Sequence, residues 1–153
     1  MNTLELKVPP AALVLTFAVV MWFISDHMPL FAFILPWRTV IAIAFVSTGV
    51  IISLISVVAF RKARTTVNPT KPITTSAMVT SGIYRLSRNP MYVGFLFALT
   101  GWATFLSHAL AFALLPFFVA YMNRFQISPE ERALAAKFDS EFAAYKQSVR
   151  RWL

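Results

Sequence analysis

Two short polar segments carry the residue types best suited to binding a charged ligand. The first, Gly82–Gly94, contains two arginines, an asparagine and two tyrosines, and the second is the pair Glu130-Glu131. A guanidinium can bind a carboxylate through two parallel hydrogen bonds. A carboxylate can in turn accept hydrogen bonds from hydroxyl or ammonium groups. If the chain brings the two segments together, they offer both halves of a polar binding site.

The spacing of the two segments predicts that they do meet. Thirty-five residues lie between Gly94 and Glu130, and most of them are apolar. At about 1.5 Å rise per residue, that length fits a helical hairpin that crosses a membrane and returns. We therefore expect both segments at one membrane interface, where a water-soluble cofactor can meet an apolar substrate.

Composition indicates that lipid is the main solvent of this chain. It has 153 residues, of which 58% are hydrophobic and 13% charged, whereas soluble domains carry about 25% charged residues. The absence of cysteine excludes disulfides, thiolate metal sites and a cysteine nucleophile. We expect one membrane domain over residues 1–153, no bound metal, and no nucleic-acid partner, because the basic residues flank apolar segments.

Four apolar stretches predict an all-α, polytopic membrane protein with about four transmembrane helices. A span needs about 20 residues, and the stretches cover residues 9–25, 36–60, 90–107 and 109–125. The turn at Ser107-His108 makes the last two a tight hairpin. Pro116 is expected to kink the fourth span. The first stretch lacks a small-residue cleavage site, so we interpret it as a retained helix rather than a signal peptide.

The distribution of basic residues predicts the orientation. On a four-span topology, thirteen of the fourteen lysines and arginines fall on one side, and only Arg38 falls on the other. The positive-inside rule then places both termini and the Arg61–Asn89 loop in the cytoplasm. The loop charges, which include Lys62, Arg64 and Lys71, also suit anionic lipid head groups.

The polar C-terminal tail is expected to form a cytoplasmic amphipathic helix over about residues 129–150. Ser128-Pro129-Glu130-Glu131 has the pattern of a capping box, with Ser128 as the cap and Glu131 three residues later. Apolar residues then recur every three or four positions. This stripe suits either the membrane surface or a lid over a site between the spans. Its members are Leu134, Phe138, Phe142, Tyr145, Val149 and Trp152.

At these residues the chain resembles the isoprenylcysteine carboxyl methyltransferase family, which is related to the phospholipid N-methyltransferases. The resemblance covers about Thr80–Trp152. It lies in the pattern Gly82-x-Tyr84-Arg85-x-x-Arg88-Asn89-Pro90-x-Tyr92-x-Gly94, in Glu130-Glu131, and in the tail Tyr145-x-x-x-Val149-x-Arg151-Trp152. Asn89 stands where the eukaryotic enzymes usually have histidine, and asparagine does not titrate near neutral pH.

The resemblance implies an enzyme that transfers a methyl group from S-adenosylmethionine to a lipidic or small apolar acceptor, such as an isoprenylcysteine carboxylate. It implies a donor pocket between the third span, the glutamate pair and the C-terminal helix. We expect catalytic roles for Arg88 and Arg151. The expected cofactor-binding residues are Tyr84, Arg85, Asn89, Pro90, Tyr92, Gly94, Glu130, Glu131 and Tyr145.

Structural interpretations compete with each of these roles. Asn89-Pro90 is an ordinary helix start, and Gly94 suits close helix packing. Two other functions also fit parts of the chain. The basic loop and amphipathic tail fit a non-enzymatic membrane subunit or lipid-surface anchor. The Pro-x-Tyr-x-Gly element occurs as well in membrane reductases that use NADPH.

Overall fold

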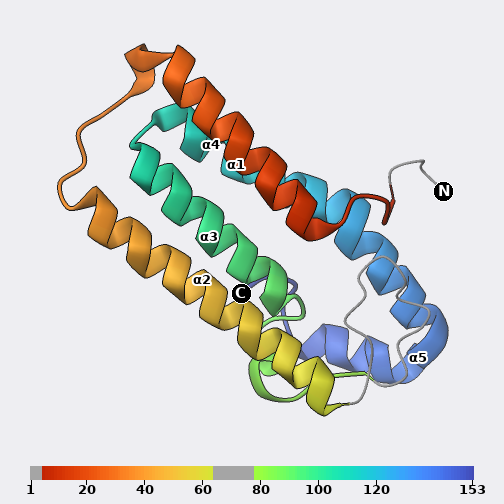
Figure 1. Ribbon diagram of the computed structural model, residues 1–153. Coiled ribbons are helices and arrows are strands. Elements are labelled where there is room, and N and C mark those ends of the chain that lie inside the picture. The colour runs from red at the N-terminus through yellow and green to blue at the C-terminus, as the bar shows by residue number, and fades with distance from the viewer. Residues whose placement is uncertain (1–4, 64–77) are drawn as a thin grey trace.

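The computed structural model describes residues 5–63 and 78–153, which are helical for most of their length. The expected loop charges Arg64 and Lys71 lie outside these residues. Figure 1 shows α1 to α4 running side by side, with α5 curving away at one end. The long helices are α1 (Pro10–His27), α2 (Arg38–Lys62), α3 (Pro90–Leu106), α4 (Ala109–Tyr121) and α5 (Ser128–Ser148). Shorter pieces are the 3₁₀ helices η1 (Pro29–Phe31) and η3 (Gly82–Arg85) and the π-helix η4 (Met122–Ile127).

The helical, membrane-type fold predicted from the sequence is confirmed. Three helical stretches among the described residues are long and apolar enough to cross a bilayer: Pro10–His27, Arg38–Lys62 and the continuous Ala109–Ser148. Helix α3 has 17 residues, at the lower limit for a span. That all four helices cross the membrane stays a prediction.

Helices α1, α3 and α4 share one apolar core. Met21, Leu99 and Phe118, one from each helix, are fully or almost fully buried there. Phe17 of α1 packs edge-on against Phe118 with ring centroids 5.4 Å apart. The indole of Trp102 also donates a 3.0 Å hydrogen bond to the Ala18 carbonyl, which fixes α3 against α1. This core holds the first turn of α3, where the polar loop enters the bundle.

Helix α2 packs along α3 through glycines. A Cβ at Gly94 would collide with the Ser53 hydroxyl and the Gly49 carbonyl oxygen, and one at Gly49 would meet the Gly94 carbonyl oxygen and the Ala98 nitrogen. Small residues at these positions therefore let the two backbones approach closely. The outward face of α2 carries exposed apolar side chains such as Val50 and Leu54, as a lipid-facing helix would.

Replacing Gly49 with alanine is expected to destabilise the α2–α3 pair by about 1–3 kcal/mol, because the added methyl group overpacks a contact made by backbone atoms on the opposite helix. Thermal unfolding of the purified protein in detergent would measure this loss. Ser47→Ala, at an exposed position of the same helix, is the matched control. Equal unfolding temperatures for the two variants would contradict close packing at Gly49.

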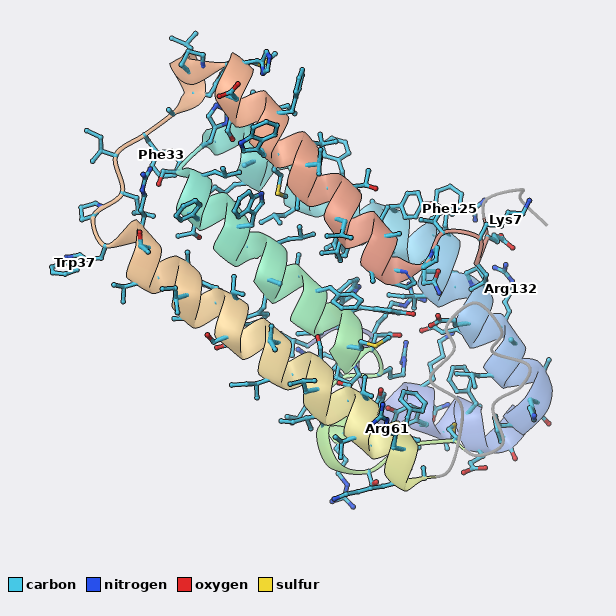
Figure 2. The ribbon with its side chains drawn as sticks, viewed as in Figure 1. Lys7, Phe33, Trp37, Arg61, Phe125 and Arg132 are labelled. Carbon is cyan, nitrogen blue, oxygen red and sulfur yellow. The ribbon has the colours of Figure 1, made fainter. Side chains whose placement is uncertain are left out.

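The predicted reversal of the chain after the third span is observed. Helix α3 ends at Ser107, whose φ of +50° lies in the left-handed region, and α4 begins two residues later. The imidazole of His108 is buried and hydrogen-bonds through Nε2 to the Met28 carbonyl at 2.9 Å. Figure 2 shows Phe33 and Trp37 at this end of the bundle, and Lys7, Arg61, Phe125 and Arg132 at the opposite end.

Two predicted helix caps are wrong. The assigned start of α5 at Ser128 is not a free helix end, because α4, η4 and α5 run on as one continuous helical stretch. Ser128 donates to the Asn123 carbonyl at 2.7 Å instead of capping, and Glu131 binds arginines. Asn89 precedes α3, but its side chain makes no capping hydrogen bond. The helix predicted over residues 129–150 is present as α5 (Ser128–Ser148), with a kink at Asp139, whose φ is +33°.

Candidate functional site

Glu131 lies between two arginines at the end of the bundle that carries the basic residues. Arg151 donates from both Nε and an Nη to its two carboxylate oxygens, at 3.1 and 2.6 Å. Arg88 donates a third hydrogen bond of 2.9 Å. The side chains of Arg88 and Glu131 are only 9% and 12% exposed, and that of Arg151 is 34% exposed. The sequence predicted that these three residues meet, but not that they bind one another.

The electrostatics of Glu131 follow from this geometry. Burial acts to raise the pKa of its carboxyl, but the hydrogen bonds from Arg151 and Arg88 outweigh burial, so the pKa lies below the usual 4.5. Glu131 is therefore ionised at neutral pH. Both of its oxygens are occupied by guanidinium groups.

Arg88 also holds the C-terminal tail. One Nη donates to the carbonyls of Lys146 and Val149 at 2.9 and 2.8 Å, and its backbone N–H donates to the Arg150 carbonyl at 2.9 Å. These carbonyls belong to the end of α5, where a cation is favourable. Its Nε is buried and has no hydrogen-bond partner among the described residues.

Asn89 and Ser87 bind the same tail from the loop before α3. The Asn89 amide and the Ser87 hydroxyl both donate to the Arg151 carbonyl, at 3.0 and 3.3 Å. The Trp152 indole donates to the Asn123 side chain at 3.0 Å. The tail is thus fixed to the loop before α3 and to η4.

Glu130 points into a second, more apolar environment. Its Oε1 accepts hydrogen bonds from the Tyr92 hydroxyl and the Gln126 amide, both at 2.6 Å. Burial raises the pKa of Glu130 to about 7, although the bonds from Tyr92 and Gln126 act in the opposite direction. Adjacent glutamates are thus ionised differently: Glu131 is a fixed anion, and Glu130 can exchange a proton near neutral pH.

Tyr84 and Tyr145 connect this cluster to the end of α2. The Tyr145 hydroxyl donates to the Tyr84 carbonyl at 2.6 Å. The buried Tyr84 ring packs edge-on against Phe60, with centroids 5.3 Å apart. Burial raises the pKa of both phenols, that of Tyr145 to about 12, so both stay protonated at neutral pH.

The remaining expected site residues lie apart from this network. Arg85 is exposed and has no hydrogen bond or ion pair among the described residues. Pro90 is buried at the first position of α3, where a missing N–H is harmless. Gly94 faces Ser53 and Gly49, which favours its packing role. Contact of these three residues with a cofactor stays a prediction.

Three polar residues of the site were not singled out from the sequence: Ser87, Asn123 and Gln126. Asn123 and Gln126 lie on the π-helix η4, which widens the helix by one residue per turn and is frequent at functional sites. Nothing in the sequence signals a π-helix. Gln126, four residues before Glu130, could have been paired with it if a continuous helix had been assumed.

The arrangement offers a polar, partly buried cluster at one end of an apolar bundle. It combines a fixed anion, two guanidiniums, a carboxyl with a pKa near 7 and protonated tyrosines. No group of three or more histidine, aspartate or glutamate side chains comes together within residues 5–63 and 78–153. Such a cluster can bind a zwitterionic ligand beside lipid.

Comparison with known proteins agrees with this picture. The family model for phospholipid methyltransferases matches residues 37–141, more than half of the chain, including α2, α3 and both glutamates. A protein of Haemophilus influenzae (strain ATCC 51907 / DSM 11121 / KW20 / Rd), described as uncharacterized, is 43% identical over 63 residues, which cover 41% of this chain and all of that protein. No solved structure matches the chain.

The apolar helices and the family match together point to a membrane methyltransferase. The chain belongs to the phospholipid methyltransferase family. The family resemblance is therefore confirmed, with Gly82–Gly94 and Glu130-Glu131 inside the matched residues and the tail from Tyr145 to Trp152 outside them.

Proposed function

We propose that the protein transfers a methyl group from S-adenosylmethionine to a lipidic or small apolar acceptor at the cytoplasmic face of a membrane. The observation that carries this proposal is the convergence of Arg88, Tyr92 and Glu130 from opposite ends of the α3–α4 hairpin, next to the apolar core. An isoprenylcysteine-like carboxylate is the acceptor that the sequence resemblance favours, and amines and thiols are its alternatives.

The residues present fit the methyl donor. The donor carries a carboxylate, an ammonium, two ribose hydroxyls and a cationic sulfur. The buried, unpartnered Nε of Arg88 is a donor suited to a carboxylate. Glu130 is suited to an ammonium or hydroxyl. The ring of Tyr92 or Tyr145 can face a cation, a contact worth about 0.5–2 kcal/mol.

Glu131 fits a different role from the one expected. Both its oxygens accept from Arg88 and Arg151, so a direct bond to the donor would have to break this ion triad. We assign Glu131 and Arg151 as positioning residues. They hold Arg88 and the tail in place while Arg88 faces the ligand.

S-adenosylmethionine, when bound, supplies a methyl group on a sulfonium: its S–CH₃ bond breaks as the bond to the acceptor forms, and the sulfur keeps the electron pair as a neutral thioether. This chain needs mainly to align the acceptor with that methyl group, which can contribute about 7–11 kcal/mol. A carboxylate acceptor attacks without losing a proton. An amine or thiol acceptor must release one, and Glu130 is the group that can take it.

We propose that the site faces the cytoplasm, with both termini and the Arg61–Asn89 loop on that side. The charge asymmetry supports this orientation. Lys7, Arg61 and Arg132 lie at the same end of the bundle (Figure 2), opposite the end where α2 starts at Arg38. The site then has access to a soluble donor on one side and to the inner leaflet on the other.

Calorimetry with S-adenosylhomocysteine tests the donor site directly. The protein in lipid nanodiscs should bind it, and Arg88→Lys, which keeps the charge but removes Nε, should bind at least about tenfold more weakly, the equivalent of one hydrogen bond to a charged group. Arg132→Gln is the control that should bind as the unmodified protein does. No binding at millimolar ligand by a folded protein would refute the proposal.

The acceptor class can be read from the chemistry of the product. Incubation with S-adenosylmethionine labelled in its methyl group, followed by lipid extraction, should give labelled lipid. Base treatment releases methanol from a methyl ester, but not from a methylamine or thioether. Release of label as methanol would identify a carboxylate acceptor, and retention of label would identify an amine or thiol.

A non-enzymatic role is the second candidate, and one observation favours it. In the Arg88–Glu131–Arg151 triad, both carboxylate oxygens of Glu131 accept hydrogen bonds from the arginines, as expected for a purely structural ion pair. On that reading, Glu130→Gln would leave the biological effect of the protein unchanged, and S-adenosylhomocysteine would not raise its unfolding temperature. A rise with S-adenosylhomocysteine would favour the enzyme.

A further inference from the structure

A second hollow lies outside the polar cluster, between the last turns of α2 and the segment that precedes α3. It has a volume of about 520 Å³, within the range of ligand pockets. Among the described residues, its walls are Ile55, Val58, Ala59, Lys62 and Ala63 at the end of α2 and residues 78–83, and none of the site residues described above lines it. It is therefore distinct from the polar cluster.

One wall of the cavity is apolar and faces the region of the bilayer. Ile55 and Val58 line it and are 48% and 47% exposed on the outer face of α2. The opposite wall is mixed: Met78, Val79 and Ile83 are apolar, and Thr80, Ser81 and Gly82 add hydroxyl and backbone polar groups. Gly82 has a φ of +62°, and a Cβ there would meet no atom within 4 Å. The cavity thus joins an apolar surface to hydroxyl and backbone groups.

A positively charged side chain lies where the two walls of the cavity meet. Lys62, the last residue of α2, lines the cavity, and no acidic side chain of the described residues forms an ion pair with it. Basic pockets at the cytoplasmic ends of transmembrane helices bind anionic lipid head groups. The apolar wall below Lys62 suits the acyl chain of the same molecule.

We propose that this cavity is a binding site for one anionic phospholipid, with its phosphate at Lys62, Thr80 and Ser81 and an acyl chain along Ile55 and Val58. The site goes beyond the proposed methyl transfer and does not require the bound lipid to be the acceptor. Ile83, which lines the cavity, directly precedes Tyr84, whose carbonyl is held by Tyr145. A lipid bound here would therefore brace the loop that carries the donor site.

Photo-crosslinking in nanodiscs tests this site without any methyl donor. Phosphatidic acid and phosphatidylcholine with the same diazirine-bearing chain would be compared, and adducts located by peptide mass spectrometry. Phosphatidic acid should label residues 55–62 and 78–83 more strongly than phosphatidylcholine does. Lys62→Gln should reduce that labelling about fivefold, as expected for one lysine near an anionic head group.

Arg61→Gln is the matched control, because Arg61 lies one residue away, is exposed and does not line the cavity. It should leave the labelling unchanged. If Lys62→Gln and Arg61→Gln lost labelling equally, or if residues 40–54 were labelled as strongly as the cavity residues, the lipid would be attracted only diffusely. Either result would overturn the proposal. Competition by glycerol 3-phosphate at equal concentration would assign the site to a soluble phosphate and overturn the lipid assignment.

A second variant tests whether the lipid binds in the cavity itself. Val58→Trp fills the cavity while keeping Lys62, so labelling at residues 78–83 should fall although the charge remains. Persistence of labelling there would contradict the cavity as the binding place. In the unmodified protein, absence of phosphatidic acid labelling at the cavity together with S-adenosylhomocysteine binding would refute this site alone, whereas labelling at the cavity without S-adenosylhomocysteine binding would refute only the proposed methyltransferase activity.

Discussion

Glu131→Gln is expected to abolish methyl transfer and to lower the stability of the protein more than any other single change in the site. Glutamine keeps the shape but removes the negative charge between the guanidiniums of Arg88 and Arg151. Removing one partner of a buried ion pair costs about 3–5 kcal/mol. Because Arg151 is 34% exposed, water screens its interaction with Glu131 and reduces that part of the loss. We therefore expect the free energy of unfolding to fall by about 3 kcal/mol, which lowers the unfolding temperature by about 6–12 °C.

The loss of stability should be greatest at the C-terminal tail, which Glu131 holds in place through Arg88 and Arg151. Hydrogen exchange of residues 146–152 should accelerate, since Arg88 holds their carbonyls only while it is itself held. Glu141→Gln is the control, because it makes the same change of side chain at an exposed position of α5, where such substitutions usually change stability by no more than about 0.5 kcal/mol. If Glu131→Gln behaved like Glu141→Gln, the triad would have no structural role.

The pH dependence of this contribution has a definite sign. The pKa of Glu131 is lower in the folded protein than the ordinary 4.5, so the folded state favours its ionised form. The stabilisation is present above about pH 4.5 and is lost as the pH falls through the lower, folded value. The unmodified protein and Glu131→Gln should therefore converge in stability on acidification.

The sequence predicted the architecture because hydrophobic length and charge asymmetry are properties of single segments. The apolar stretches, Pro90 at the start of the third span, and the turn at Ser107-His108 each act locally. The meeting of Arg88 with Glu131 was also predictable, since a hairpin of two similar helices must return its ends to one interface. These inferences needed no knowledge of side-chain contacts.

The details of the site depended on contacts that local patterns do not encode. Ser128 and Glu131 match a capping box, but a cap is needed only where backbone N–H groups are free, and the continuous helix leaves none free there. The partners of Glu131 come from residues 43 and 20 positions away. Similarly, the side chain of Asn89 makes no capping hydrogen bond and donates to the Arg151 carbonyl instead. Tertiary hydrogen bonds displaced the local ones in each case.

The second large effect is expected at Glu130, whose role depends on the acceptor. If the acceptor is an amine or thiol, methyl transfer should rise with pH around a midpoint near 7, where the Glu130 carboxyl loses its proton. Glu130→Gln should then reduce the rate about 10²–10⁴-fold, the usual contribution of a general base, and abolish the midpoint. Glu141→Gln, at an exposed position of α5, should change neither.

Tyr92→Phe refines this test. The hydrogen bond from the Tyr92 hydroxyl stabilises the ionised form of Glu130 and lowers its pKa. Without that bond the pKa of Glu130 should rise, so the midpoint of activity should move to higher pH. A midpoint that stayed in place in Tyr92→Phe, or that persisted in Glu130→Gln, would show that another group titrates.

The protonation of Glu130 also affects the stability of the folded protein, whatever the methyl acceptor is. Its pKa in the folded protein, about 7, lies above the 4.5 of an ordinary glutamate, so the folded state binds more protons between these values. Stability from this group is fully present below about pH 4.5 and is lost as the pH rises through 7. Unfolding temperature should therefore decline from pH 5 to pH 8 in the unmodified protein and decline less in Glu130→Gln. Identical declines would mean that Glu130 ionises normally and cannot serve as the base.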